Sequence, residues 1–171
     1  NNQFRRLKKE GIHVYSIRGN HDAQNNLSRF ITRLDNVHEF PTGPYTFKNE
    51  EKGFAVHGQS YPSREVRDNL VKNYPPPVKG LFNIGLLHTN ITGSPEHDSY
   101  APTSVDELRS FGYDYWALGH VHNRAELNRD PYIVYSGNIQ GRNIRERGKK
   151  GCYLVAVRDR TVDELRFIPL D

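Results

Sequence analysis

Apolar residues recur at intervals of three and four positions in four segments, a spacing typical of amphipathic helices. These segments are residues 4–10, 26–34, 63–70 and 104–111. Gly11 and Gly112 follow two of them as stop signals. Ser104 and Glu107 form a capping box at the start of the last segment, and Ser63 is expected to cap the short third one.

Unbroken or β-branched apolar runs predict the strands. They cover residues 12–17, 37–40, 45–47, 54–57, 81–87, 115–118, 133–135, 152–158 and 162–168. Asp159 and Arg160 are expected to form the hairpin turn between the last two. Helices alternate with strands at first and only strands follow, so the pattern predicts a single α/β domain.

Polar residues follow three of these strands directly. They are the segment Arg18–Asp22, His88, and the segment Gly119–His122. Open α/β sheets place ligand sites at such strand ends. Imidazole nitrogens and an amide oxygen are suitable ligands for Zn, Mn, Fe or Ni. In extended backbone His120 and His122 would point to the same face and share a metal cluster. For any one of these histidines, a hydrogen-bonded loop residue is the alternative interpretation.

Composition narrows the class of protein. The 171 residues fit one domain, and the net charge of +4 with a pI near 9.2 is compatible with a polyanionic partner. The single cysteine, Cys152, lies in an apolar run and is expected to be buried and inert. No run has the length of a membrane span or of a signal-peptide core, so a soluble, cytoplasmic protein is expected. Methionine is absent, which suggests an N-terminal truncation.

Basic residues cluster between the strands predicted at 133–135 and 152–158. They are Arg142, Arg145, Arg147, Lys149 and Lys150. Arginine forks match phosphate oxygens, so contact with a DNA backbone or a scissile phosphate is one interpretation, and a solvated basic loop is the other. The polar segment 89–102 could form a rim around the predicted site. His57 is expected to be structural, and Trp116, Tyr113 and Tyr115 are expected in the core.

The three motifs in their order, Gly-Asn-His-Asp, a strand ending in histidine, and Gly-His-x-His, resemble the calcineurin-like metallophosphoesterase superfamily. Residues 56–61, 113–120 and 136–148 are similar to its DNA repair exonuclease branch, of the SbcD-like and YhaO-like type. The resemblance implies a mixed β-sandwich with flanking helices, a four-layer α/β fold that here lacks its first strands and helices. Residues 1–171 would be the C-terminal portion of one catalytic domain.

The resemblance also implies roles for single residues. Asn20, His88 and His120 would bind one metal ion, and His122 would bind a second. His21 would be the catalytic acid, with Asp22 as its orienting partner. The two divalent ions would be Mn²⁺ first, with Zn²⁺ or Fe as alternatives. The motifs Asp-x-His and Gly-Asp-x-x-Asp of the superfamily precede Gly-Asn-His-Asp, but the 18 residues before Gly19 contain no aspartate. Weak or single metal occupancy is therefore expected in this chain.

The function expected from these features is metal-dependent hydrolysis of DNA phosphodiesters, of the exonuclease type, in DNA repair. DNA would be the main partner, a coiled-coil ATPase and a second copy of the chain would be further partners, and no membrane is expected. Two alternatives remain open. One is a phosphatase or small-molecule phosphodiesterase, and the other is a non-catalytic binding module on the same fold.

Overall fold

A six-stranded mixed sheet forms the centre of the protein. The computed structural model describes residues 2–22, 34–91, 100–144 and 146–170. The strands of the central sheet are β3 (Tyr45–Asn49), β4 (Phe54–Gly58), β5 (Phe82–His88), β6 (Tyr115–Gly119), β8 (Tyr132–Tyr135) and β7 (Ala125–Arg129), in that spatial order. The four inner strands β4, β5, β6 and β8 are parallel, while β3 and β7 are antiparallel at the two edges.

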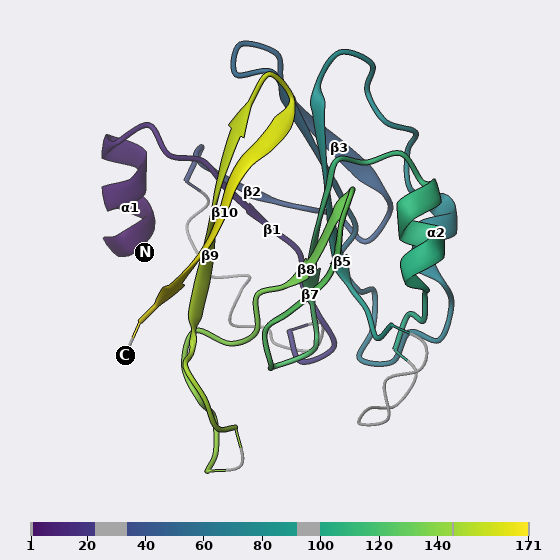
Figure 1. The fold of residues 1–171 in the computed structure, drawn as a ribbon, viewed down its shortest axis with the longest axis vertical. Coiled ribbons are helices and arrows are strands. Elements are labelled where there is room, and N and C mark those ends of the chain that lie inside the picture. Colours follow the sequence, from purple (N-terminus) through teal and green to yellow (C-terminus); the bar gives the residue numbers. More distant parts are fainter. Residues whose placement is uncertain (1, 23–33, 92–99, 145, 171) are drawn as a thin grey trace.

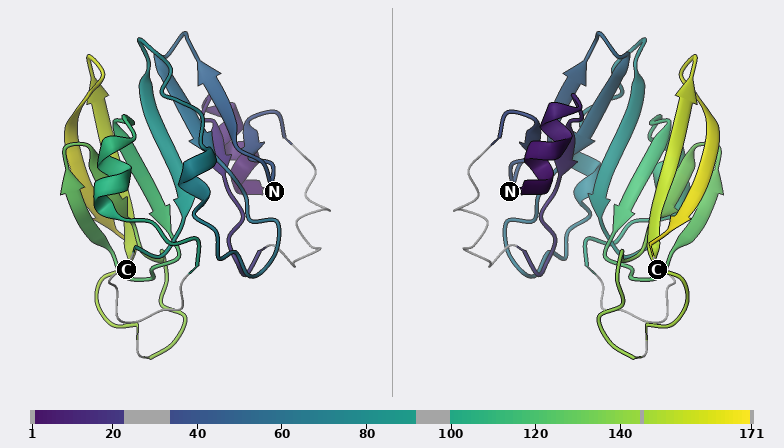
Figure 2. Two further views of the ribbon diagram at one scale, coloured as in Figure 1. Left: turned by 90° about the vertical axis from the view of Figure 1, so that its right-hand side faces the viewer. Right: turned by 90° about the vertical axis from the view of Figure 1, so that its left-hand side faces the viewer.

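Two strand pairs cover one face of this sheet. The strands β1 (Val14–Ser16) and β2 (Val37–Glu39) pair in parallel, and β9 (Gly151–Arg158) and β10 (Thr161–Pro169) form an antiparallel hairpin. The ring centroid of Tyr15 on β1 lies 6.0 Å from that of Phe54 on β4. Val155 on β9 packs against a cluster that includes Phe82 and Val134. Figure 2 shows the two pairs at opposite lateral ends of the molecule.

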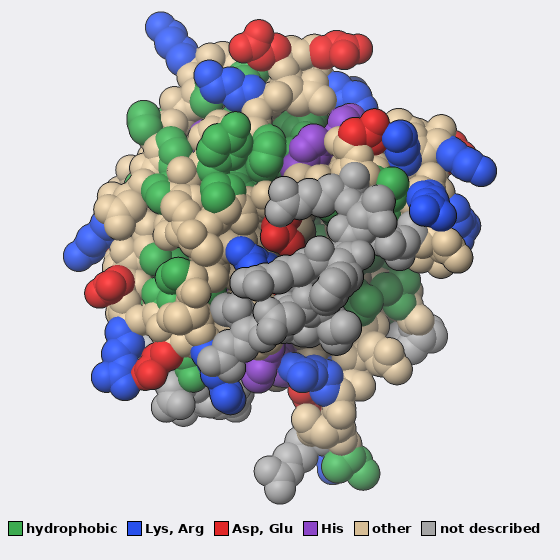
Figure 3. Space-filling model, turned by 180° about the vertical axis from the view of Figure 1, so that it is seen from behind, with side chains coloured by type: hydrophobic (Ala, Val, Ile, Leu, Met, Phe, Trp, Pro, Cys, Tyr) green, Lys and Arg blue, Asp and Glu red, His purple; other side chains and the backbone are tan. Residues whose placement is uncertain are grey.

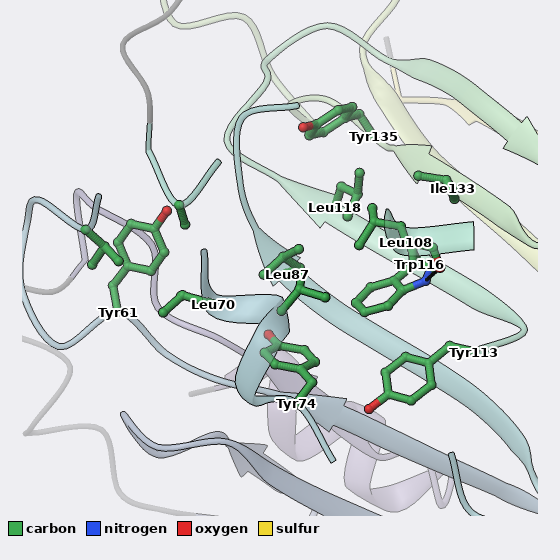
Figure 4. Packing of buried hydrophobic residues seen from close by; sticks show 13 residues of the cluster. Tyr61, Leu70, Tyr74, Leu87, Leu108, Tyr113, Trp116, Leu118, Ile133 and Tyr135 are labelled. Carbon is green, nitrogen blue, oxygen red and sulfur yellow. Dashed lines mark hydrogen bonds between the residues drawn. The ribbon is translucent and has the colours of Figure 1, made fainter. Parts of the chain in front are cut away.

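The opposite face of the sheet carries the larger core. The helix α2 (Val105–Ser110) and the 3-10 helix η2 (Leu70–Asn73) contribute to this core. Trp116, Leu87, Leu108 and Ile133 are fully buried in it and lie together in Figure 4. The N-terminal helix α1 (Asn2–Lys9) lies on the other side of the strands from α2 (Figure 1). Two strand layers between helices confirm the expected fold class, an α/β sandwich with flanking helices.

Side-chain alternation explains how each inner strand serves both cores. On β6, Tyr115 faces the cluster beneath β9 and β10, whereas Trp116 faces the core beneath α2. Tyr113 stacks on Trp116, so these three aromatic residues lie in the core as expected. His57 on β4 is fully buried, and its Nε2 lies 3.0 Å from Asn83 Oδ1. A structural role for His57 is therefore confirmed.

Capping residues account for three of the predicted helix boundaries. The Ser104 side chain accepts a hydrogen bond from the Glu107 backbone N–H at 3.1 Å, and α2 follows. Gly11 and Gly112 have positive φ values of 65° and 91° after their helices, as the stop signals required. Asp159 and Arg160 also have positive φ values, and they form the predicted turn between β9 and β10.

Two expectations about the fold are wrong, and one strand was missed. Ser63 begins no helix, because its hydroxyl donates to the Glu65 carbonyl at 2.8 Å, and η2 instead begins after Asn69. Cys152 is exposed, because β9 turns alternate residues toward solvent and only the intervening ones pack on the central sheet. The edge strand β7 carried no apolar signal and was not predicted.

Some predicted features are outside the described residues. The helix expected over residues 26–34 falls mostly on residues 23–33, and the polar segment 89–102 falls mostly on residues 92–99, including His97. In the part of the chain that is described, none of the helices has the length and apolar character needed to cross a membrane.

Candidate metal and phosphate site

The predicted site residues meet at the carboxyl ends of the parallel strands. Because β4, β5, β6 and β8 run in the same direction, the segments that follow them emerge at one edge of the sheet, and those segments gather at the lower end of the molecule in Figure 1. An open pocket of about 940 Å³ lies at this edge. Its lining includes Asn20, His21, Asp22, Arg64, His88, Tyr100, His120, His122, Asn138 and Arg142.

Three side chains converge at the base of this pocket. His88 is the last residue of β5, and its Nε2 lies 3.0 Å from the amide oxygen Oδ1 of Asn20. The Nδ1 atom of His120 lies 3.3 Å from the same Nε2 atom of His88. Three elements separated in sequence therefore bring two imidazole nitrogens and one amide oxygen to a common point. These are the residues that the family resemblance assigned to the first metal ion.

His88 is held firmly in this arrangement. The Tyr61 hydroxyl donates to the His88 carbonyl oxygen at 2.9 Å, and the two rings meet edge to face with centroids 5.0 Å apart. A Cβ atom at Gly19 would lie only 2.3 Å from His88 Cε1, so a glycine is needed for this close approach. Burial, reinforced by the neighbouring His120 and His21, lowers the pKa of His88 to about 4. The ring is therefore neutral at physiological pH, the form that binds metals.

The backbone at the Gly-His-x-His segment differs from the expectation. His120 has a φ of 98°, in the left-handed region that favours glycine, so the segment is not extended and the same-face argument for His120 and His122 is wrong. The ring of His120 turns toward His88. The ring of His122 turns toward Glu146, and its Nδ1 lies 2.8 Å from Glu146 Oε1. Both histidines still line the pocket.

Glu146 is a site residue that the sequence did not predict. Its side chain is 12% exposed, and it lies in the segment between β8 and β9 that was read as a basic loop. Hydrogen bonds from the Arg142 backbone N–H and from His122 lower the pKa of Glu146 to about 2. One acidic residue between two arginines was the only sequence signal, and it gave no indication of a contact across 24 positions.

His21 and Asp22 lie on the exposed rim of the pocket. The Asp22 carboxylate accepts a hydrogen bond from the Gly19 backbone N–H at 3.3 Å, and the Asp22 N–H donates to the Gly19 carbonyl at 3.1 Å. Asp22 thus stabilises the turn that carries Asn20. The expected orienting contact from Asp22 to His21 does not occur among the described residues, because the carboxylate is turned back toward the backbone.

Of the two predicted phosphate-binding arginines that the structure describes, one reaches the pocket. Arg142 lines it, Arg147 is exposed elsewhere, and Arg145 is outside the described residues. Arg64, which follows β4, lines the same pocket and was not predicted. On the face in Figure 3, Lys and Arg side chains lie mostly at separate places around the outline, so charge on this face is dispersed.

The donor set at the base of the pocket fits one divalent cation incompletely. Two imidazoles and an amide oxygen suit ions such as Mn²⁺ or Zn²⁺. Among residues 2–22, 34–91, 100–144 and 146–170, no three His, Cys, Asp or Glu side chains form a metal-binding group. Asp22 and Glu146 are engaged by other partners. Asp22 lines the pocket, but among the described residues no carboxylate joins Asn20, His88 and His120 in a metal-binding group.

Comparison with known proteins supports the family resemblance. The model of the calcineurin-like phosphoesterase family matches residues 1–124. The chain is 41% identical over 160 residues to a Bacillus subtilis (strain 168) protein named uncharacterized metallophosphoesterase YhaO, covering 91% of this chain and 39% of that protein. It is 28% identical over 167 residues to the DNA double-strand break repair protein Mre11 of Methanocaldococcus jannaschii, covering 89% and 44% respectively. The chain thus spans less than half the length of these curated relatives.

Proposed function

This chain belongs to the calcineurin-like phosphoesterase family, and we propose that it forms part of a metal-dependent phosphodiesterase of the exonuclease type that acts on DNA. The observation that carries the proposal is the convergence of Asn20, His88 and His120 at the base of an open pocket, with contacts of 3.0 and 3.3 Å. Imidazole nitrogens and an amide oxygen gathered in a concave site are suited to a hydrolytic metal centre.

Asn20, His88 and His120 would hold the first ion, and His122 would contribute to the second. Mn²⁺ is the ion that the repair-nuclease resemblance favours, with Zn²⁺ or Fe as alternatives. Divalent ions, when bound, supply Lewis-acid stabilisation of the phosphate oxygens and activate water. The incomplete donor set makes weak or single occupancy the expectation for the 171-residue chain alone.

Other residues of the pocket would act on the substrate directly. His21 lies on the rim, where an imidazole can donate a proton to the departing oxygen. Arg142 and Arg64 line the pocket from segments that follow different strands, so they can contact the phosphates that flank the scissile bond. The described residues offer neither guanidinium an ion-pair partner within 4.0 Å, which leaves both available to a phosphate.

Three observations favour DNA over a small phosphoester. The pocket is open and holds about 940 Å³, which accommodates more than a single phosphate group. The net charge of +4 favours a polyanion. A relative that shares 28% identity carries the name of a DNA double-strand break repair protein. A coiled-coil ATPase partner and a homodimer remain proposals that derive from the family resemblance.

The test is a hydrolysis assay on the full-length protein and on the 171-residue chain. Labelled single-stranded and duplex oligonucleotides are compared with p-nitrophenyl phosphate, each with Mn²⁺ and with EDTA. We expect Mn²⁺-dependent release of nucleotides by the full-length protein. His88→Ala and His120→Ala should abolish it, because each removes a ring from the donor set.

His13→Ala is the matched control, because His13, just before β1, contacts His38 on β2 and does not line the pocket. It should leave hydrolysis unchanged. Rapid hydrolysis of p-nitrophenyl phosphate with DNA untouched would replace the proposal by a phosphatase. Calorimetry that detects no metal binding, together with inactivity on every substrate, would favour a non-catalytic binding module.

A further inference from the structure

We propose that Glu146 is a positioning residue that fixes the proton of His122 on Nδ1 and presents the opposite nitrogen, Nε2, to the pocket. The effect on metal binding rests on the proposed function. The contact between Glu146 and His122 is observed in the chain itself. Nothing in the motifs of the sequence assigns a role to Glu146, and it lies 24 residues from His122.

In the contact between His122 and Glu146, the histidine must be the hydrogen-bond donor. A carboxylate offers acceptors only, so the contact of 2.8 Å between His122 Nδ1 and Glu146 Oε1 requires the hydrogen to lie on Nδ1. In a neutral ring the other nitrogen, Nε2, then carries a lone pair. The two ring nitrogens point in different directions, and His122 lines the pocket. The free lone pair is therefore the one available to a ligand there.

Several hydrogen bonds hold the Glu146 carboxylate in place. Its Oε2 accepts from the Arg142 backbone N–H at 3.0 Å and from Asn138 Nδ2 at 3.1 Å. Asn143 Nδ2 lies 3.4 Å from Oε1. The segment between β8 and β9 therefore folds around this carboxylate, whose side chain is only 12% exposed. A side chain held by several donors has a fixed direction and can impose it on His122.

The segment between β8 and β9 also contacts the backbone of His122. The His122 carbonyl accepts from the Asn138 N–H at 3.1 Å and from Lys150 Nζ at 3.3 Å. Gly137 has a φ of 73°, and a Cβ atom there would lie 2.8 Å from the His122 carbonyl oxygen. The segment thus contacts both the main chain and the ring of His122. Carboxylate–histidine pairs of this kind raise the basicity of a metal-binding imidazole and fix its tautomer.

The test measures the tautomer without any metal. Long-range proton–nitrogen spectra are recorded on the EDTA-treated chain at pH 8.5, well above the ordinary imidazole pKa of about 6.5. We expect His122 to carry its proton on Nδ1 in the wild type. Glu146→Ala should shift the ring toward the Nε2–H form that imidazole prefers in water. Glu164→Ala, which removes a carboxylate paired with Arg166 on β10, is the matched control and should change nothing.

A second variant separates the role in positioning from the role in folding. Glu146→Gln keeps the size of the side chain but leaves one acceptor oxygen for His122, Arg142 and Asn138 to share, so the Nδ1–H population should fall while the fold is retained. A wild-type proton on Nε2, or the wild-type tautomer in both Glu146 variants, would overturn the inference.

Metal binding supplies the readout that distinguishes this inference from the proposed function. Both Glu146 variants should bind Mn²⁺ about 10- to 100-fold more weakly in calorimetry, as loss of a carboxylate behind a metal-binding histidine typically does. A changed tautomer with unchanged affinity would support the orienting contact but remove His122 from the metal ligands, which would contradict the proposed second ion. An unchanged tautomer with weaker affinity would overturn the role of Glu146 and leave the metal site in place.

Discussion

Gly19→Ala should damage the candidate metal site directly, because the added methyl group would overlap the ring of His88. The added Cβ would lie 2.3 Å from Cε1, 2.5 Å from Nδ1 and 2.8 Å from Nε2 of His88. Carbon atoms pack at about 3.5–4.0 Å, so the ring must retreat by roughly 1 Å. The Tyr61 hydroxyl and the edge-to-face contact oppose that movement. Overpacking of this kind costs about 1–3 kcal/mol.

The displacement would separate His88 Nε2 from Asn20 Oδ1, which now lie 3.0 Å apart. Since about 1.4 kcal/mol corresponds to a tenfold change in an equilibrium constant, Mn²⁺ affinity should fall about 10- to 100-fold. Calorimetric titration with Mn²⁺ measures the affinity, and urea unfolding in EDTA measures the stability of the metal-free chain. Gly119→Ala should have a smaller effect, because its Cβ would lie 3.2 Å from His88 Nδ1.

Gly43→Ala is the matched control, because no atom lies within 4 Å of its added Cβ and its φ is not positive. Equal Mn²⁺ affinity and equal free energy of unfolding in the Gly19→Ala and Gly43→Ala variants would contradict this prediction. Such a result would mean that His88 can shift freely and that its contact with Asn20 does not define the site.

Three further predictions address the substrate contacts, the buried histidine and the core. Arg64→Ala should weaken DNA binding several-fold in fluorescence anisotropy and reduce the slope of log affinity against log salt concentration by about one. Arg67→Ala is the control and should have less effect, because the Arg67 side chain is already paired with Glu65. Equal losses of affinity in the two variants would contradict the role of the pocket. Burial lowers the pKa of His57, so below about pH 6.5 the unfolded chain binds a proton that the folded chain does not. The free energy of unfolding should therefore fall as the pH drops below about 6.5, by up to about 1.4 kcal/mol per pH unit. His57→Gln should flatten this dependence in urea titrations, and an unchanged slope would refute it. Leu87→Ala, at a fully buried position, should destabilise the fold by about 2–5 kcal/mol in the same assay, and a loss below about 1 kcal/mol would contradict its place in the core.

The sequence predicts best the strands that are buried on both faces of the sheet. The strand β5 is buried between two cores, so its unbroken apolar run predicted it correctly. β7 was missed because it is an edge strand with a largely polar sequence, and backbone pairing with β8 holds it in the sheet. Cys152 was misplaced for a related reason, since an apolar run does not reveal that only one side of β9 packs on the sheet.

The place of the candidate site was predictable because parallel strands end at one edge. His88 ends β5 and His120 follows β6, so both emerge at that edge, where Asn20 from the segment after β1 joins them. The directions of side chains were less predictable. Asp22 was expected to contact His21, but its carboxylate accepts a hydrogen bond from the backbone N–H of Gly19, because an aspartate side chain readily bonds a backbone N–H a few residues away in a turn.

The Gly-His-x-His segment shows most clearly why spacing alone could not define the site. Two residues that are two apart share a face only in extended backbone, and the φ of 98° at His120 breaks that rule. The left-handed turn sends the ring of His120 toward His88, while the ring of His122 reaches Glu146. The turn therefore separates two adjacent imidazoles so that each has its own partner across one pocket. An extended segment would have directed both rings to one point and left Glu146 without its histidine.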